Sequence, residues 1–176
     1  MSRLRGAALA RRLARLRAFI LDVDGVLTDG GLWYGARGEP LRRFDVKDGL
    51  GLRLVQEAGV AVAFISGETG NALLRRAAKL RVRDVYSGVE DKRSTLLRFL
   101  ASRKIIPADA AYMGDDLNDL GPLRAAGLAI APADAAAEVL RVAHWRTSRT
   151  GGRGAVREVC DALLAARLQF SPPSDR

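Results

Sequence analysis

The sequence has only one cysteine, Cys160, and only one histidine, His144. A single cysteine cannot close an internal disulfide, which is typical of the reducing cytoplasm, so we predict a cytoplasmic protein. We interpret Cys160 as a small buried residue on the last predicted helix. His144 stands beside Trp145 on a predicted strand, and we expect it to serve the structure and not catalysis.

Long apolar runs are also missing, and no stretch is long enough to span a membrane. Residues 1–17 lack the apolar core of a signal peptide. Their arginines could suggest a transit peptide, but Leu9, Leu13 and Leu16 recur at helical spacing. We therefore predict an amphipathic helix over 1–17 that packs on the following domain. Residues 171–176 are rich in proline and serine and predict a disordered, flexible tail.

Acidic residues are outnumbered, because 29 Lys+Arg against 20 Asp+Glu give a net charge of +9. Such an excess can indicate a nucleic-acid partner, but these arginines are scattered along several predicted helices and do not form a block with aromatic residues. The alternative is a small anionic substrate. We expect that small-molecule partner, and neither a nucleic acid nor a membrane.

Strand-like and helix-like segments alternate along the rest of the chain, without an internal repeat. Apolar runs predict strands near 19–21, 60–65, 84–86, 110–113 and 128–130. Helices are expected over 48–58, 69–80, 91–104, 117–126, 134–141 and 155–168, and Asp48 is expected to cap the first of them. This alternation predicts one Rossmann-like α/β domain over 18–170, with a mostly parallel sheet covered by helices on both faces.

Residues 30–44 interrupt the alternation. Two short strand-like pieces flank a glycine-rich turn there, which predicts a β-hairpin. The hairpin carries Trp33 and Tyr34, and large aromatic side chains are unfavourable on an isolated, exposed hairpin. We therefore expect it either to pack on its own domain or to pair with another subunit.

Polar residues follow the predicted strands, and the carboxyl ends of parallel strands meet at one edge of a sheet. Asp22 and Asp24 end the first strand, where alternation places them on one face before a sharp turn at Gly25. The later loops offer Ser66-Gly67, Lys92 at the start of a helix, and the acidic run Gly114-Asp115-Asp116-Leu117-Asn118-Asp119.

These residue types suit phosphoryl transfer. One carboxylate can attack phosphorus and form an aspartyl-phosphate. A second carboxylic acid can protonate the leaving alkoxide and then activate water. Mg²⁺ held by carboxylates offsets the repulsion between the attacking carboxylate and the phosphate. Lys92 and the Ser66 hydroxyl can stabilise charge on the transferred oxygens.

In this order the four motifs resemble those of the haloacid dehalogenase superfamily. More narrowly, Thr28-Asp29-Gly30, Asp45-Val46-Lys47-Asp48-Gly49 and Gly151-Gly152-Arg153-Gly154-Ala155-Val156-Arg157-Glu158 resemble the capless 3-deoxy-D-manno-octulosonate 8-phosphate phosphatases. The resemblance implies a chain without a cap domain. It also implies a homotetramer in which the 30–44 hairpin joins neighbouring subunits and helps to close the active site.

Carried over by motif, the resemblance implies Asp22 as nucleophile and Asp24 as general acid/base, with Ser66 binding phosphoryl oxygens. The implied Mg²⁺ site comprises Asp22, the backbone carbonyl of Asp24, Asp115 and, through bound water, Asp119. Asp119 and Asp116 would orient that water or Lys92. Implied sugar-acid contacts, some offered across a subunit boundary, are Asp45, Val46, Lys47, Asp48, Gly49, Arg53, Glu68, Arg76, Lys79, Lys92 and Arg153.

Several of these substrate contacts have plain structural alternatives. Arg53 and Arg76 could be surface arginines on helices, and Glu68 with Lys79 could be a surface ion pair. The run from Gly151 to Gly154 could be a flexible link, although its glycines also permit close approach of the backbone to a ligand.

Glu68 departs from the octulosonate enzymes, which usually have arginine directly after the motif glycine. A sister group acting on nine-carbon sialic-acid-type 9-phosphates resembles the chain better here, with Gly-Glu and a lysine eleven residues later, where Lys79 stands. Exchanging a guanidinium for a carboxylate reverses the local charge and should change how the sugar acid is held.

The resemblance thus implies a Mg²⁺-dependent phosphatase acting on 3-deoxy-D-manno-octulosonate 8-phosphate. The alternative substrates are 2-keto-3-deoxy-nonulosonate or N-acylneuraminate 9-phosphates. A non-enzymatic alternative is an oligomerisation module like the one fused to sialic-acid cytidylyltransferases, which the chain also resembles. Such a module would be marked by the loss of a motif residue, and none is lost here.

Overall fold

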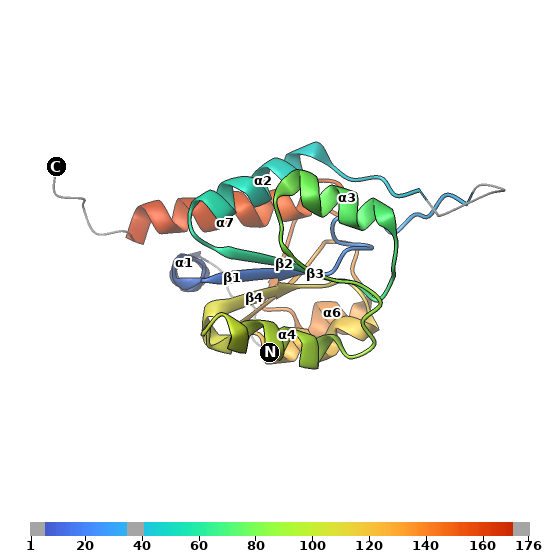
Figure 1. Cartoon of the computed structure of the whole chain (residues 1–176). Coiled ribbons are helices and arrows are strands. Elements are labelled where there is room, and N and C mark those ends of the chain that lie inside the picture. Colours follow the sequence, from blue (N-terminus) through green and yellow to red (C-terminus); the bar gives the residue numbers. More distant parts are fainter. Residues whose placement is uncertain (1–5, 35–40, 171–176) are drawn as a thin grey trace.

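The computed structural model describes residues 6–34 and 41–170 (Figure 1). Its centre is a six-stranded sheet in the order β3-β2-β1-β4-β5-β6, in which neighbouring strands are parallel. The predicted parallel α/β fold is therefore confirmed. The strands are β1 (Ala18–Leu21), β2 (Ala61–Ile65), β3 (Asp84–Tyr86), β4 (Ala110–Met113), β5 (Leu128–Ala131) and β6 (Trp145–Arg146).

Helices cover both faces of this sheet (Figure 1). Side chains alternate along β1, so that Phe19 and Leu21 enter one apolar core while Ile20 enters the other. The first core lies under α2 (Val46–Glu57), α3 (Asn71–Leu80) and α7 (Ala155–Phe170), with α1 (Gly6–Arg15) against α7. The second lies under α4 (Lys92–Ser102), α5 (Leu120–Ala125) and α6 (Ala137–Val142). Short 3-10 helices, η1 (Pro107–Asp109) and η2 (Leu117–Asp119), flank β4.

The N-terminal helix packs as its pattern predicted. Leu13 and Leu16 are buried in the first core, and Leu9 packs against it. Cys160 is buried on α7, as predicted. His144 is also structural, because its Nδ1 accepts the backbone N–H of Ala129 at 2.9 Å and so ties the start of β6 to β5. Residues 1–5 and the predicted tail, 171–176, lie outside the described residues.

The prediction that Asp48 caps α2 is wrong. The helix begins at Val46, and its cap is Asp45, whose carboxylate accepts the backbone N–H groups of Lys47 and Asp48 at 2.6 and 3.3 Å. Asp48 lies inside the helix and is buried. Its carboxylate accepts backbone N–H groups at the start of α7 instead, from Gly154 at 3.3 Å and Arg157 at 2.7 Å.

The helix predicted over 134–141 is only partly formed. The structure has α6 there, which begins later, at Ala137. Asp134 stands before it and accepts the backbone N–H of Gly151 at 3.0 Å. This hydrogen bond anchors the glycine-rich loop that leads into α7. Asp134 therefore binds a distant segment of the chain and does not belong to the first turn of a helix.

The predicted hairpin appears as an arm that extends from the body of the molecule (Figure 1). Its two sides pair in antiparallel fashion at Trp33 and Leu41, through two backbone hydrogen bonds of 3.2 and 2.9 Å. Residues 35–40 lie outside the described residues. Trp33, Tyr34 and Leu41 are 71%, 73% and 70% exposed, so these large side chains do not pack on their own domain.

Among the helices of the described residues, none is both long enough and apolar enough to cross a lipid bilayer.

Candidate active site

A polar cavity of about 280 Å³ opens at the carboxyl edge of the sheet, where the loops after β1, β2, β3 and β4 meet. β1 and β4 are neighbours there although they are far apart in sequence, and such a switch point is where open α/β sheets bind ligands. The structure thus brings together the residues of all four motifs. The cavity is lined by Asp22, Asp24, Gly25, Gly30, Ser66, Gly67, Glu68, Lys92, Asp115, Asp116 and Asn118.

Lys92 lies at the base of this cavity between two carboxylates. Its Nζ is 2.9 Å from Oδ1 of Asp22 and 2.8 Å from Oδ1 of Asp119, and all three side chains are buried. Burial raises the pKa of Asp22 well above its usual value, the charge of Asp119 raises it further, and Lys92 opposes both. Burial alone would lower the pKa of Lys92, but the two carboxylates outweigh that effect and raise it. The ammonium group is therefore held charged.

Tyr112 supports the same cluster and was not identified from the sequence. Its hydroxyl donates to Oδ1 of Asp119 at 2.8 Å, and the whole side chain is buried on β4. Burial raises the pKa of Tyr112 well above its usual value, and the charge of Asp119 raises it further. A tyrosine inside an otherwise apolar strand is the sequence signal for this contact, because a buried hydroxyl requires a hydrogen-bond partner.

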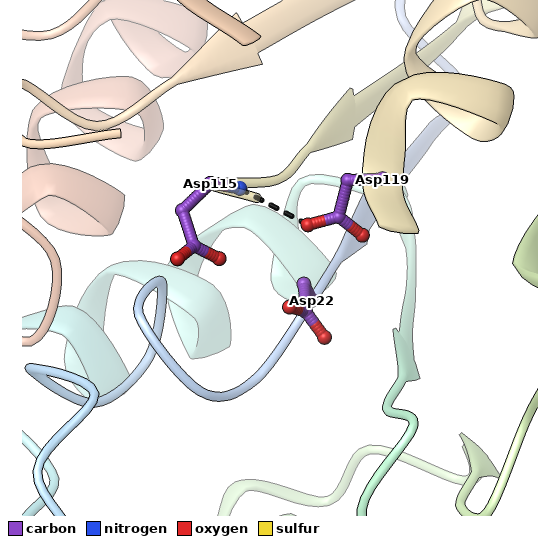
Figure 2. Close-up of side chains that lie close together, drawn as sticks. All are labelled: Asp22, Asp115 and Asp119. Atoms are coloured by element: carbon purple, nitrogen blue, oxygen red, sulfur yellow. Dashed lines mark hydrogen bonds between the residues drawn. The ribbon is translucent and has the colours of Figure 1, made fainter. Parts of the chain in front are cut away.

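Three carboxylates converge on one space in this site (Figure 2). Asp22, Asp115 and Asp119 each offer an oxygen, and these oxygens lie within 4.8 Å of one another. Burial raises the pKa of Asp115 to about 7, with further contributions from Asp119 and Asp116. Oδ1 of Asp115 is buried and has no hydrogen-bond partner among the described residues. One lysine does not neutralise three carboxylates, so the donor set fits a hard divalent cation.

The acidic loop after β4 is folded around Asp119. Oδ2 of Asp119 accepts the backbone N–H of Asp115 at 3.0 Å, a bond drawn in Figure 2, and that of Asp116 at 3.5 Å. Gly114 makes this fold possible, because a Cβ there would lie 2.5 Å from the Asp119 side chain. The other oxygen of Asp119 accepts hydrogen bonds from Lys92 and Tyr112, so Asp119 is placed to orient the Lys92 ammonium.

Asp24 lies in the loop after β1 and lines the cavity. Its Oδ1 accepts a hydrogen bond from Nε of Arg42 at 2.8 Å, and the hydroxyl of Thr28 lies 3.4 Å from the same oxygen. Gly25 has a φ of +84°, and a Cβ at that position would lie 2.0 Å from Asp115. The glycine therefore allows the turn that was expected and also the close approach of two loops of the site. Arg42, on the returning side of the arm, was not identified from the sequence.

The loop after β2 places Ser66 and Glu68 in the lining of the cavity. Oγ of Ser66 is buried and accepts the backbone N–H of Glu68 at 3.1 Å, so that its own O–H can donate to a ligand. Glu68 is exposed and lines the cavity. Lys79 does not line it, and the described residues include no ion pair between Lys79 and Glu68.

Other predicted substrate contacts hold the structure around the cavity without lining it. Nη2 of Arg76 donates to the backbone carbonyl of Asp45 at 2.6 Å, and its guanidinium lies 5.6 Å from the centre of the Phe44 ring. Gly49 leaves room for that guanidinium, since a Cβ there would be 2.3 Å from Nη2. The rest of the predicted 45–49 segment, Val46 and Lys47 with Asp48, forms the first turn of α2 and also stays outside the cavity lining.

Two further arginines pair with acidic neighbours. Nη2 of Arg153 lies 3.2 Å from Oδ2 of Asp29, so the glycine-rich loop contacts the loop after β1. Nη2 of Arg53 lies 3.9 Å from Oε1 of Glu57 on the surface of α2. Within one chain, the structure therefore joins the four motifs but leaves Arg53, Arg76, Lys79 and Arg153 outside the cavity lining. Their role in substrate binding stays a prediction.

Comparison with known proteins places this site in a family. Residues 76–159 match the haloacid dehalogenase-like hydrolases. The chain is 42% identical over 157 residues to 3-deoxy-D-manno-octulosonate 8-phosphate phosphatase of Yersinia pestis, which covers 89% of this chain and 84% of that protein.

Solved structures agree with the sequence comparison. The Moraxella catarrhalis 3-deoxy-D-manno-octulosonate 8-phosphate phosphatase, in complex with a magnesium ion, a phosphate ion and a KDO molecule, superposes with a TM-score of 0.89 at 35% identity, covering 92% of this chain and 93% of that one. The cobalt-bound deoxy-D-mannose-octulosonate 8-phosphate phosphatase of Haemophilus influenzae gives 0.87 at 36% identity, covering 92% and 96%. With this cavity, this sheet and these relatives, the chain belongs to the 3-deoxy-D-manno-octulosonate 8-phosphate phosphatase family of haloacid dehalogenase-like hydrolases.

Proposed function

We propose that the protein hydrolyses 3-deoxy-D-manno-octulosonate 8-phosphate to 3-deoxy-D-manno-octulosonate and phosphate, and that it requires Mg²⁺. The observation that carries the proposal is the buried cluster in which Lys92 holds Asp22 beside Asp115 and Asp119. The names of the relatives support the sugar-acid substrate. The excess of basic residues suits a substrate that carries both phosphate and carboxylate.

Asp22 and Asp24 divide the chemistry. A carboxylate oxygen of Asp22 attacks the phosphorus, the bond to the sugar oxygen breaks, and that oxygen leaves with the electron pair and takes the proton of the Asp24 carboxylic acid. Water then attacks the phosphorus of the aspartyl-phosphate while Asp24 takes its proton. The bond between phosphorus and Asp22 breaks, which releases phosphate and restores both carboxyl groups.

Lys92 and Ser66 stabilise the phosphoryl group during its transfer. The ammonium of Lys92 fixes Asp22 and adds positive charge where the phosphoryl oxygens gather. The hydroxyl of Ser66, held by the backbone N–H of Glu68, donates to one of those oxygens. Asp119 orients Lys92 through its 2.8 Å contact and keeps the loop of Asp115 in place.

Mg²⁺ fits the residues that are present. Asp22 and Asp115 offer carboxylate oxygens to the same space, one of them buried without a partner, and the backbone carbonyl of Asp24 completes the proposed set. When bound, the cation neutralises charge on the phosphoryl oxygens and on the attacking carboxylate. Because both oxygens of Asp119 already accept hydrogen bonds, its contact with the cation is proposed to run through water.

Glu68 favours a second candidate substrate. It lines the cavity, where a carboxylate would repel the carboxylate of a sugar acid and would accept hydrogen bonds from its hydroxyls. A longer nine-carbon acid, such as 2-keto-3-deoxy-nonulosonate or N-acylneuraminate 9-phosphate, places its carboxylate farther from the phosphate. This alternative predicts higher kcat/KM for the nine-carbon 9-phosphates than for the eight-carbon 8-phosphate.

The assembly is proposed to be a homotetramer in the cytoplasm. Trp33, Tyr34 and Leu41 expose large apolar surfaces on the arm, and a neighbouring subunit would cover them. A neighbouring subunit would also supply those sugar-acid contacts that the family resemblance implies across a subunit boundary.

The deciding experiment measures phosphate release by the full chain from the eight-carbon and nine-carbon substrates and from an aryl phosphate. Metal is first removed with chelator, and Mg²⁺ is then added back. We expect activity only with Mg²⁺, none in Asp22→Asn, and the highest kcat/KM for the octulosonate phosphate. A preference for nine-carbon substrates would support the alternative. No release of phosphate from any of these esters would overturn the proposed enzymatic activity and favour the alternative of an oligomerisation module.

A further inference from the structure

Arg42 is a buried cation that the catalytic scheme so far leaves without a role. Only 1% of its side chain is exposed, although it belongs to the arm and the adjacent Leu41 is 70% exposed. An isolated guanidinium is unfavourable in such a place, and Asp24 supplies its counter-charge at 2.8 Å. The arm therefore turns one arginine inward, toward the residue proposed as general acid/base.

The pair is joined through one oxygen only. Nε of Arg42 donates to Oδ1 of Asp24, while Oδ2 of Asp24 and Nη1 of Arg42 are both buried without a hydrogen-bond partner among the described residues. Asp24 lines the cavity, whereas Arg42 does not. Arg42 thus holds one oxygen of the carboxylate, and the other is a buried acceptor without a partner among the described residues.

The returning side of the arm is anchored on both sides of this contact. Leu41 pairs with Trp33 across the arm, and Nη1 of Arg43 donates to the backbone carbonyl of Gly152 at 2.9 Å. Oδ2 of Asp29 lies 3.7 Å from the same Arg43 nitrogen. Arg42 is therefore held in place by its neighbours and does not depend on the ion pair alone for its position.

We propose that Arg42 is a positioning residue for the reaction: it fixes Oδ1 of Asp24 and so directs Oδ2 toward the leaving oxygen of the phosphate ester. This inference rests on the proposed function. It makes the arm part of the catalytic machinery within its own subunit, in addition to any contact with a neighbour. Because Arg42 does not reach the cavity, it should affect the rate of the chemical step more than substrate binding.

The test compares Arg42→Ala with wild type on two substrates, a sugar phosphate with an alkoxide leaving group and an aryl phosphate whose phenolate leaves without a proton. Single-turnover reactions with enzyme in excess time only the first phosphoryl transfer. We expect the sugar-phosphate rate to fall about 10- to 100-fold and the aryl-phosphate rate by less than about threefold. Arg42→Lys should recover most of the loss, and KM should change little.

Two further variants keep the result interpretable. Arg141→Gln removes a guanidinium whose ion pair with Glu138 lies on the exposed surface of α6, outside the arm and the cavity lining, and we expect it to keep the wild-type difference between the two substrates. In an Asp24→Asn background, Arg42→Ala should cause no additional loss, because the residue through which it acts is already disabled. Thermal unfolding of each variant identifies any general loss of structure.

The outcomes separate this inference from the function on which it rests. Equal losses on both substrates, a full additional loss in the Asp24→Asn background, or an equal effect of Arg141→Gln would overturn the role of Arg42 while leaving the phosphatase intact. Faster turnover in Arg42→Ala would also overturn it, since the ion pair would then be restraining Asp24 from the reaction. If wild type hydrolyses neither ester, the proposed function fails and this role fails with it.

Discussion

At the scale of single residues, Lys92 balances the charge of the site. It is the ammonium shared by Asp22 and Asp119 in a region where water has little access. Attraction between opposite charges is strong there, but so is the penalty for leaving one of them unpaired. The same residue therefore stabilises the fold and, in the proposed mechanism, prepares Asp22 for attack on phosphorus.

Replacing Lys92 by methionine, which keeps most of the volume, should affect both properties. We expect the free energy of unfolding to fall by about 3 kcal/mol, because two carboxylates stay buried without their cation. We expect kcat to fall roughly 100-fold or more. Urea unfolding and steady-state phosphate release measure the two effects, with the exposed Lys104→Met as control. Activity within tenfold of wild type would contradict the assignment.

Asp115 links the site to pH. Its folded-state pKa of about 7 lies above the ordinary 3.8, so proton binding stabilises the cation-free fold. That stabilisation is fully present below about 3.8 and is lost as the pH rises through about 7. Mg²⁺ competes with the proton for the same carboxylate, so the rise in Tm on adding Mg²⁺ should be small at pH 5.5 and several degrees larger at pH 8.

Thermal unfolding with and without Mg²⁺ at several pH values checks this expectation. Asp115→Asn should abolish most of the metal-dependent rise at every pH. A Mg²⁺ effect that does not change with pH, or that survives in Asp115→Asn, would show that the cation binds elsewhere.

At the scale of elements, the glycine-rich loop before α7 holds the loop after β1 that carries Asp24. The backbone N–H of Gly152 donates to the carbonyl of Val26 at 2.9 Å. A Cβ on Gly151 would lie 1.8 Å from the carbonyl oxygen of Gly25. The two loops touch backbone to backbone, so the position of Asp24 depends on residues more than a hundred positions later. The sequence predicts that these glycines allow close approach to a ligand. In the structure the close approach is to protein backbone, and contact with a ligand stays a prediction.

Gly151→Ala should therefore disturb both stability and catalysis. We expect a loss of about 2 to 4 kcal/mol in the free energy of unfolding, because backbone atoms cannot move aside as a flexible side chain can. We also expect a fall in kcat of about tenfold or more, as the loop of Asp24 shifts.

Gly59→Ala is the control for adding a methyl group where there is room. Gly59, unlike Gly151, has a positive φ, and no atom lies within 4 Å of its Cβ position. The control should lose only about 1 kcal/mol through backbone strain and keep its kcat. Equal effects of the two substitutions on kcat would mean that the tight contact between the loops is unimportant for catalysis.

At the scale of the whole molecule, the arm extends an apolar surface away from a compact α/β body (Figure 1). The proposed tetramer predicts that Trp33→Lys combined with Leu41→Lys gives monomers in light scattering. It should also lower kcat/KM for the sugar phosphate at least tenfold, since contacts from a neighbour are lost. Activity on an aryl phosphate should fall less. A variant that stays tetrameric would place the subunit contact on another surface.

Much of this architecture could be predicted from the sequence, because its signals are local. Short apolar runs before Asp22, Ser66 and Asp115 indicated strands, and parallel strands place their carboxyl ends at one edge whatever the details of packing. Lys92 could be included because it starts the helix that follows the third strand. The misplaced cap of α2 shows the limit, since Asp45 and Asp48 are equally good capping residues and only the contact of Asp48 with α7 distinguishes them.

The sequence by itself determined the order of the elements and the set of carboxylates and cations at the sheet edge, through periodicity and chain direction. Only the tertiary structure decided that Arg42 faces Asp24, that Tyr112 supports Asp119, and that the predicted sugar-acid arginines stay outside the cavity of their own chain. The reason is physical: each of these outcomes depends on the path of a loop or on a backbone approach between distant segments, and no local pattern of residue types encodes such a meeting.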